Sequence, residues 1–334
     1  MTALSILDLA PVPMGASPGD ALRRARDLAQ HAERLGYNRY WMAEHHNMVG
    51  IASAATSVAL CYVGAGTSTI RIGSGGVMLP NHSPLVIAEQ FGTLDALFPG
   101  RVDLGLGRAP GTDGRTWRAM RRDPESSDRF PHDVLELQAL LGPVQEGQAV
   151  RAVPGADSHV PLWILGSSLY GAQLAAALGL PYAFASHFAP EALMDALQMY
   201  RDNFRPSAQL ARPYAMVGCN IIGADTDDEA RRLFTSQQQS FTNMLRNTRG
   251  KLAPPIDDID TYWAPHEKTQ ASRMLAKSVV GSAATVRAGV QRLLDETGAD
   301  ELMVAAAIFD QDARIHSYEV LAEALVGHEQ RKAA

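Results

Sequence analysis

The chain contains 334 residues, of which 46% are hydrophobic and 20% are charged, and its formal net charge is −6. A chain of this length can bury a large core within one domain, whereas its negative net charge argues against a nucleic-acid partner. No stretch approaches the ~20 apolar residues that cross a bilayer, and the N-terminus lacks a basic start followed by an apolar run, so we expect a cytoplasmic protein without a signal peptide.

The first elements in chain order are a strand and a helix. Residues 4–11 form a β-like apolar run, and Ser17 then precedes Pro18 and Asp20. Serine is a preferred N-cap, proline suits the first helical position, and an acidic residue favours the positive end of the helix dipole. These residues predict a helix that starts at Pro18 and stops at Gly36.

The remaining sequence repeats this alternation. Further strands are predicted at 37–43, 70–79, 101–107, 162–166, 182–186, 214–223 and 302–309. Helices are predicted at 51–66, 84–98, 130–141, 169–178, 190–203, 228–245, 285–297 and 317–325.

The strand pattern indicates the fold class. Most of the strands are continuous apolar runs, which are typical of parallel strands covered on both faces. Eight strand–helix repeats favour a closed (β/α)8 barrel, the TIM barrel, formed by residues 1–334 as a single domain. An open doubly wound sheet is the alternative, although the first strand–helix turn lacks the GxGxxG motif of dinucleotide-binding sheets.

Two segments interrupt the alternation. Residues 109–129 are polar, and residues 247–277 form an extended insertion between strand 7 and strand 8 that contains Pro254-Pro255. Long irregular segments in compact domains are usually functional lids or mobile segments. We therefore expect residues 247–277 to form a mobile lid, with a disordered connector as the alternative.

The carboxyl ends of barrel strands carry the active site in enzymes of this architecture. Glu44, His45 and His46 follow the second strand and form the densest titratable group at any strand end. A histidine there can act as a general acid or base near neutral pH. The alternatives are a metal site, for which only His187 offers a further ligand, and a structural role that suits His46 better than His45. Adjacent strand residues point to opposite faces, so we expect no metal.

Three other strand ends suggest a ligand with a flat ring and a phosphate. Gly75 and Gly76 interrupt an apolar strand, which would let a ring approach the backbone or would mark a bulge. Arg108 follows a glycine-rich strand end, and Ser167 and Ser168 stand where the fifth strand turns into a helix. Helix-start amides, serine hydroxyls and a guanidinium together favour binding of a phosphate.

The ordered series of motifs resembles the bacterial luciferase-like flavin-dependent monooxygenases. The matching stretches are WMAEHH at 41–46, RIGSGGVMLPNHSPLVIAEQFGTLDALFPGRVDLGLGRAPGTD at 71–113 and LWILGSS at 162–168. The resemblance implies a barrel that binds reduced FMN and uses O2 to oxidise a small organic substrate. The later part of the chain agrees in the order of its elements more than in its motifs.

The resemblance also implies roles for individual residues. His45 takes the position of the catalytic histidine, and Arg108 that of the phosphate-binding arginine. Gly75 and Gly76 take the place of the small residues that are joined by a cis peptide bond beneath the flavin. The reactive cysteine of luciferases is Gly107 here, so light emission is not implied.

The phosphate site implied by the resemblance includes the end of the fifth strand. Ser167 and Ser168 take the positions of an acidic residue and a serine, so the acidic member is replaced. The backbone amides that follow belong to Leu169, Tyr170 and Gly171.

Partners follow from the resemblance as well. The chain has no flavin-reductase domain, so a separate NAD(P)H:flavin reductase would supply the reduced flavin. A homodimer is expected through the small, apolar helix 51–66 and helix 84–98. A deazaflavin-dependent oxidoreductase on the same fold, a non-catalytic flavin-binding protein and a metal-dependent barrel hydrolase are the alternative functions.

Overall fold

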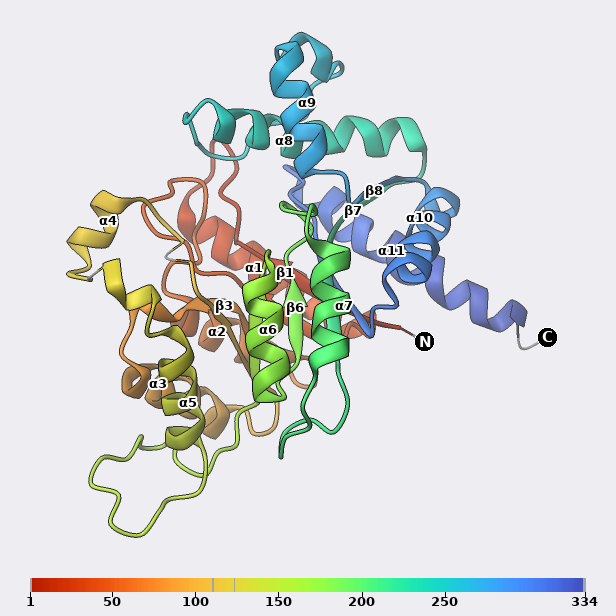
Figure 1. The fold of residues 1–334 in the computed structure, drawn as a ribbon. Helices are drawn as coiled ribbons and strands as arrows, with labels where there is room; N and C mark the ends of the chain where they lie inside the picture. The colour runs from red at the N-terminus through yellow and green to blue at the C-terminus, as the bar shows by residue number, and fades with distance from the viewer. Residues whose placement is uncertain (1, 110, 123, 333–334) are drawn as a thin grey trace.

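A computed structural model describes residues 2–109, 111–122 and 124–332 of the chain (Figure 1). The predicted domain 1–334 also includes residues 1, 110, 123 and 333–334, which lie outside the described residues. The strands are β1 (Ala3–Asp8), β2 (Arg39–Met42), β3 (Arg71–Met78), β4 (Val102–Gly107), β5 (Leu162–Gly166), β6 (Tyr182–Phe184), β7 (Ala215–Gly223), β8 (Ser278–Gly281) and β9 (Glu301–Ala305).

The strands close into a barrel. Their order is β6-β5-β4-β3-β2-β1-β9-β7-β8, and β6 also pairs with β7. Eight parallel strands therefore form a ring, and β8 extends the sheet outside it by pairing with the end of β7. This confirms the predicted TIM barrel and excludes the open sheet, because the pairing of β6 with β7 leaves the ring without a free edge.

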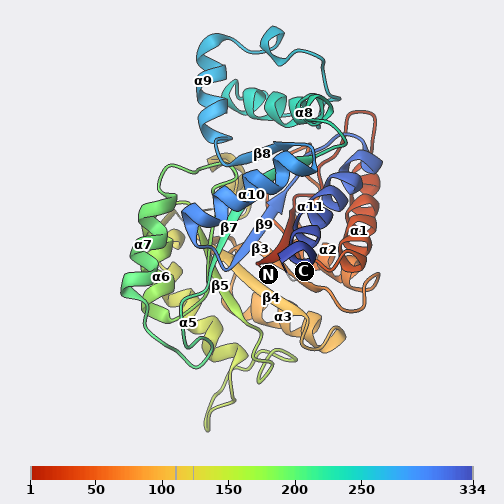
Figure 2. The same cartoon turned by 90° about the vertical axis from the view of Figure 1, so that its right-hand side faces the viewer.

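Helices surround the barrel (Figures 1 and 2). They are α1 (Pro18–Arg34), α2 (Thr56–Gly64), α3 (Pro84–Leu97), α4 (Gly114–Ala119), α5 (Phe130–Leu141), α6 (Leu169–Leu178), α7 (Leu193–Asn203), α8 (Asp227–Leu245), α9 (Pro265–Met274), α10 (Ala283–Thr297) and α11 (Gln311–Lys332). Short 3-10 turns are η1 (Leu79–Asn81), η2 (Pro124–Ser127) and η3 (Ile259–Thr261). None of the helices in the described part of the chain is long and apolar enough to span a membrane.

The start of α1 is determined locally, as the sequence predicts. The Ser17 side chain accepts a hydrogen bond from the Asp20 amide at 3.1 Å, and the Asp20 carboxylate accepts one from the Ser17 amide at 2.9 Å. This reciprocal capping box satisfies two amides that the first helical turn leaves without partners.

The predicted helix 51–66 is wrong in its first turn, because α2 begins only at Thr56. Ile51 instead forms an antiparallel bridge with Pro11, and the Ala52 amide donates to the Ala10 carbonyl at 3.1 Å. Alanine-rich composition favours a helix, but the antiparallel pairing with the segment after β1 holds the backbone around Ile51 in an extended conformation that a helical turn cannot adopt.

The predicted insertion between strand 7 and strand 8 of the barrel contains regular structure that the sequence pattern did not indicate. Residues 247–277 include η3 and α9, and β8 follows immediately. Both views show α8 and α9 stacked beyond one end of the barrel (Figures 1 and 2). The segment is therefore not a structureless connector, while its mobility remains a prediction.

Polar side chains fill the amino-terminal end of the barrel. Arg39 of β2 lies 2.8 Å from the carboxylate of Asp103 on β4 and 2.8 Å from that of Glu301 on β9. Arg71 contacts Asp103 at 2.6 Å, and the Ser5 hydroxyl donates to Glu301. All of these carboxylates are paired, which is the condition under which buried charge is tolerated.

An apolar layer lies directly above this polar layer. Because side chains on one face of a strand recur every second residue, Leu7 and Trp41 follow Ser5 and Arg39 toward the carboxyl ends. The Trp41 ring meets the Trp163 ring edge-on at 5.1 Å. Other members of the layer are Ala43, Ala183, Met216 and Met303. This layer forms the floor on which the functional site is built.

Candidate active site

A cavity of about 790 Å³ opens at the carboxyl ends of the strands. Most of the residues singled out from the sequence line it, namely His45, Gly75, Gly76, Arg108, Ser167, Ser168, Tyr170 and Gly171. Leu169 does not line it, and its side chain is 37% exposed. The size of the cavity is within the usual range for a cofactor or drug-sized ligand.

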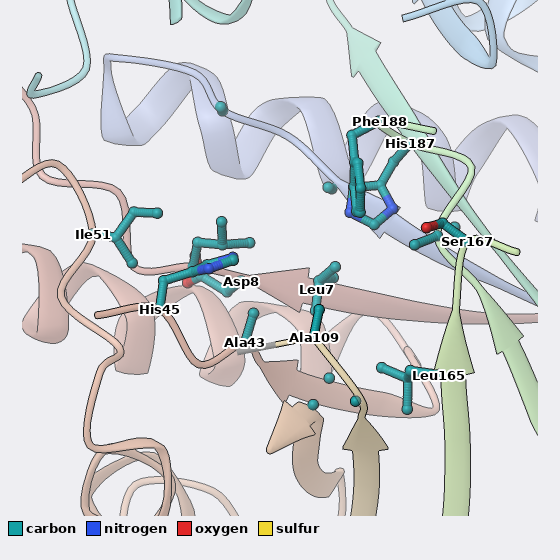
Figure 3. A pocket seen from close by; sticks show the side chains of 18 of the residues that line it. Leu7, Asp8, Ala43, His45, Ile51, Ala109, Leu165, Ser167, His187 and Phe188 are labelled. Atoms are coloured by element: carbon teal, nitrogen blue, oxygen red, sulfur yellow. The ribbon is translucent and has the colours of Figure 1, made fainter. Parts of the chain in front are cut away.

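His45 lies just beyond β2 and lines the cavity (Figure 3). Its Nδ1 lies 3.4 Å from the carbonyl oxygen of Gly111. A carbonyl can only accept, so this contact favours the tautomer that carries the proton on Nδ1 and leaves Nε2 free to accept a proton. Burial lowers the pKa of His45, which keeps the ring neutral at pH 7.

Glu44 and His46 lie outside the cavity lining and belong to a separate hydrogen-bonded cluster. The buried Glu44 carboxylate accepts from His46 Nε2 at 2.6 Å, His82 Nε2 at 2.9 Å, Asn81 Nδ2 at 3.1 Å and the Met78 amide at 3.0 Å. Burial alone would raise the pKa of Glu44, but the hydrogen bonds from His46 and His82 hold it at about 2. The hydrogen bond to Glu44 raises the pKa of His46.

This cluster changes which residues could form the metal site that the sequence leaves as an alternative. Glu44, His46 and His82 are the group in the described residues whose ligand atoms lie within 4.8 Å of one another, whereas His187 lies elsewhere in the cavity wall. The sequence reasoning missed His82, four residues after β3, which η1 turns back toward Glu44. The 2.6 Å separation between His46 and Glu44 is that of a hydrogen bond, and shared ligation of one ion would require these atoms to move apart.

Gly75 and Gly76 line the cavity and are joined by a cis peptide bond. The register between β3 and β4 shifts between Gly75 and Val77, so the pair also forms a bulge. A Cβ on Gly76 would lie 2.7 Å from the Gly105 carbonyl oxygen, and one on Gly75 would lie 2.7 Å from Leu7 Cδ1. Close packing inside the barrel therefore accounts for both glycines without requiring a bound ring.

Arg108 follows β4, and Ser167 and Ser168 follow β5. The Arg108 guanidinium lies 4.3 Å from the centroid of the Tyr170 ring, so the two side chains bring β4 and the start of α6 together. Arg108 Nε donates to the Ser127 carbonyl at 3.3 Å, and the Asp128 carboxylate, which is 79% exposed, lies 3.7 Å from the guanidinium. Such an exposed pair holds the guanidinium only weakly and leaves it available to a ligand.

The N-terminus of α6 faces the same end of the cavity. Ser168 is the N-cap residue, and its hydroxyl makes no capping hydrogen bond within the described residues. The Tyr182 hydroxyl donates to the Ser168 carbonyl at 3.2 Å and so supports this turn. Helix-start amides, two serine hydroxyls and the Arg108 guanidinium are donors of the kind that bind an anion.

Several residues of the cavity were missed from the sequence because they come from distant segments. Asp8 at the end of β1 pairs with Arg314 of α11 at 2.8 Å. Asn220 of β7 and Gln237 of α8 form a second polar group beside His187. Isolated asparagine and glutamine residues carry no spacing signal, so only the folded arrangement reveals them.

Part of the predicted lid contributes to the cavity wall. Residues 249–252 line it, and Leu252 exchanges backbone hydrogen bonds with the segment after β1, at 2.9 Å to Val12 and 2.8 Å from Met14. The insertion after α8 is thus connected by backbone hydrogen bonds to the loop after β1, and both segments line the cavity.

A closed parallel barrel whose cavity at the carboxyl ends combines an anion-binding helix start with a neutral histidine defines an α/β-barrel enzyme. The family model described as luciferase-like monooxygenase matches residues 2–301. A luciferase-like monooxygenase of Escherichia coli strain K12 is 57% identical over 319 residues, which cover 95% of each chain.

Solved structures agree with this match. The crystal structure of apo-MsnO8 has a TM-score of 0.90 and 37% identity, covering 97% of this chain and 98% of that chain. The oxygenating constituent of 3,6-diketocamphane monooxygenase from a Pseudomonas putida plasmid, in complex with FMN, has a TM-score of 0.72 and 16% identity, covering 96% of this chain and 97% of that chain.

The chain belongs to the luciferase-like monooxygenase family. It is therefore an oxidoreductase that incorporates oxygen, and a cofactor of flavin type is supported.

Proposed function

We propose that the protein is a monooxygenase that uses reduced FMN and O2 to oxidise a small organic substrate. The observation that carries the proposal is that one cavity contains both an anion-binding end, made by Arg108 and the start of α6, and the free Nε2 of His45. A flavin could bind through its phosphate at the anion-binding end of the cavity. Its ring would then lie near His45 Nε2.

FMN fits the residues that are present. The guanidinium of Arg108, the hydroxyls of Ser167 and Ser168, and the backbone amides at Leu169, Tyr170 and Gly171 would hold its phosphate. The isoalloxazine ring would rest over the cavity floor at Gly75 and Gly76. The FMN complex of the diketocamphane monooxygenase, which shares the fold, supports this choice of flavin.

His45 is the candidate catalytic residue. When bound, reduced FMN supplies the electrons for the reaction with O2. The neutral His45 ring would take or return a proton at Nε2, while its Nδ1–H is directed at the Gly111 carbonyl. This division of roles between the ring nitrogens keeps the imidazole oriented during proton transfer.

The walls of the cavity are suited to exclude water. Phe188, Phe241 and Met244 contribute apolar surface, and residues 249–252 border the opening. Exclusion of water limits the unproductive release of hydrogen peroxide. Residues 247–277 are accordingly proposed as a lid over the bound flavin and substrate.

Two partners complete the proposal. Reduced FMN would come from a separate NAD(P)H:flavin reductase, as the resemblance to the luciferase-like monooxygenases implies. A homodimer would form through α2 and α3, where Val58 is 69%, Val86 43% and Leu97 57% exposed. Large apolar side chains that are exposed on two neighbouring helices support a subunit interface at this surface.

The test is an anaerobic mixture of the protein with reduced FMN, followed by a pulse of O2. We expect the protein to slow the loss of reduced FMN to hydrogen peroxide relative to free FMN, because the cavity limits access of water. An identical peroxide yield and rate with and without protein would contradict a monooxygenase. Selective binding of a reduced deazaflavin with indifference to O2 would indicate the deazaflavin-dependent alternative, and FMN binding without any effect on its reaction with O2 would indicate a non-catalytic flavin-binding protein.

A further inference from the structure

We propose that His187, Asn220 and Gln237 form a polar subsite that recognises a neutral hydroxyl or amide group at one end of an otherwise apolar substrate. The proposal rests on the proposed function, because it assigns the substrate to the cavity shared with the flavin. These residues come from the loop after β6, from β7 and from α8, and all three line the cavity.

The orientation of both side-chain amides in the polar subsite follows from one fixed acceptor. The backbone carbonyl of His187 can only accept, so the group 2.7 Å from it must be the Asn220 amino group. Asn220 Oδ1 is then an acceptor, and the group 2.6 Å from it must be the Gln237 amino group. Gln237 Oε1 is left as an acceptor.

This acceptor is buried and lacks a partner. Gln237 is 4% exposed, and its Oε1 has no hydrogen-bond partner among the described residues. A buried acceptor without a partner is costly, and a ligand that donates a hydrogen bond removes that cost. Gln237 lines the cavity, so the donor can come from a ligand there.

His187 supplies the complementary donor. Its ring packs directly on the backbone of Gly218, where an added Cβ would lie 2.6 Å from Nδ1. Nδ1 is buried without a hydrogen-bond partner among the described residues, and a buried N–H without an acceptor is disfavoured. Orphaned buried N–H groups are rarer in proteins than under-satisfied acceptors, so we infer that the proton is on Nε2, which is left for the ligand. Figure 3 shows the His187 side chain among the residues that line the cavity.

The charge of the polar subsite defines the chemistry of the ligand. Burial, and to a smaller extent the His45 ring, lowers the pKa of His187 to about 4, so the imidazole is neutral at pH 7. The polar subsite offers one N–H donor and one carbonyl acceptor, and a group that both accepts and donates, such as a hydroxyl or a secondary amide, would use both. A carboxylate would meet the partial negative charge of Gln237 Oε1 and would bind poorly.

The surroundings of the polar subsite are apolar. Phe188 meets the His187 ring edge-on at 4.9 Å, and Phe241 and Met244 of α8 line the same cavity. The substrate therefore has an apolar body, and the polar subsite would hold one end of it in a fixed orientation relative to the flavin and His45.

The experiment measures the affinity of the full-length protein, with and without FMN, for three probes by calorimetry. The probes are 4-ethylphenol, 4-ethylanisole, which cannot donate, and 4-ethylbenzoate, which is anionic. We expect 4-ethylphenol to bind about 10-fold more tightly than either of the others, the effect of one buried hydrogen bond. Equal binding of the phenol and the anisole, or tighter binding of the benzoate, would overturn the proposal.

Gln237→Met should remove the preference for the phenol, and Gln239→Met is its matched control. Gln239 is on the same helix, is also 4% exposed and also donates one hydrogen bond, to the Pro254 carbonyl at 2.9 Å, but it does not line the cavity. His187→Phe, which keeps a ring and removes the donor, provides a second variant if Gln237→Met does not fold. A preference that persists in both His187→Phe and Gln237→Met, or that Gln239→Met abolishes equally, would contradict the polar subsite.

The same samples are titrated anaerobically with reduced FMN, the form that the proposed function uses. Unchanged FMN affinity in the Gln237 variant together with a lost phenol preference supports the polar subsite. Failure of the wild-type protein to bind reduced FMN overturns the proposed function, whereas normal binding of reduced FMN without phenol preference overturns only the polar subsite.

Discussion

The reactivity of His45 depends on which ring nitrogen carries the proton. The 3.4 Å contact with the Gly111 carbonyl favours a proton on Nδ1, and burial lowers the pKa of the ring. We expect His45→Gln to lower kcat/KM by about 10²–10⁴-fold, the usual contribution of a general acid or base. Product formation with regenerated reduced FMN measures this effect, and affinity for reduced FMN should stay unchanged.

His46 is the natural contrast to His45, because it is adjacent in sequence and points to Glu44 instead of the cavity. His46→Gln should lower stability while leaving kcat/KM near the wild-type value. Equal losses of activity in the two variants would contradict the assignment of His45 as the catalytic residue.

His187 couples stability to pH. Its pKa falls from 6.5 to about 4 on folding, so the unfolded chain binds the proton more tightly. The stability contributed by this group is therefore fully present above pH 6.5 and is lost as the pH falls from 6.5 through about 4. The shift corresponds to a loss of about 3 kcal/mol.

Urea denaturation of the wild type and His187→Phe across this pH range isolates the contribution of His187. We expect the free energy of unfolding to fall less steeply with decreasing pH in the variant, because other acid-sensitive groups such as Glu44 are common to both proteins. Parallel curves would show that His187 does not bury a neutral imidazole.

At the scale of elements, the contact between β3 and β4 distinguishes the two adjacent glycines. A Cβ at position 76 would meet the Gly105 backbone at 2.7 Å, whereas one at position 75 would lie 2.7 Å from the end of the Leu7 side chain and 3.2 Å from Trp41. Side chains can move more easily than a neighbouring strand, so Gly75→Ala should cost about 1–3 kcal/mol. We expect Gly76→Ala to cost more, as measured by chemical denaturation, and the reverse order would contradict this account.

The helices and strands also differ in how well they can be predicted from the sequence. The α1 capping box at Ser17 and Asp20 is local, so adjacent residues suffice to predict it. The strand β8 forms only because β7 extends beyond the barrel and offers its edge at 220–223, a condition set far away in the chain. Likewise, the predicted helix does not begin at Ile51, because Ile51 and Ala52 pair in an extended conformation with the segment after β1.

The residues of the candidate site likewise include some that the sequence predicts and some that it does not. Residues next to strand ends, such as His45, Arg108 and Ser168, could be predicted because the barrel brings all strand ends to one face. His82, Gln237 and Arg314 could not, since their contacts depend on how η1, α8 and α11 pack onto the barrel. Burial and partners, which decide whether a polar residue is structural or functional, exist only in the folded chain.

For the whole molecule, the exposed apolar side chains of α2 and α3 predict a dimer. Val58→Asp would introduce a charge into this surface, and burying an unpaired charge is strongly unfavourable. We expect the variant to sediment as a monomer where the wild type sediments as a dimer. Val150→Asp is the control, because Val150 is similarly exposed at 58% and lies outside both helices. A wild type that is monomeric at micromolar concentration would exclude the proposed interface.

The measurement that tests the central claim most directly is the anaerobic affinity of the protein for reduced FMN compared with reduced riboflavin, which lacks the phosphate. If Arg108 and the start of α6 bind a phosphate, the wild type should bind reduced FMN about 10–100-fold more tightly than reduced riboflavin, because hydrogen bonds to a charged group contribute an effect of this size. Arg108→Met should remove most of that preference. Equal affinity for the two flavins, or binding of neither, would contradict the claim that these strand ends form a flavin phosphate site.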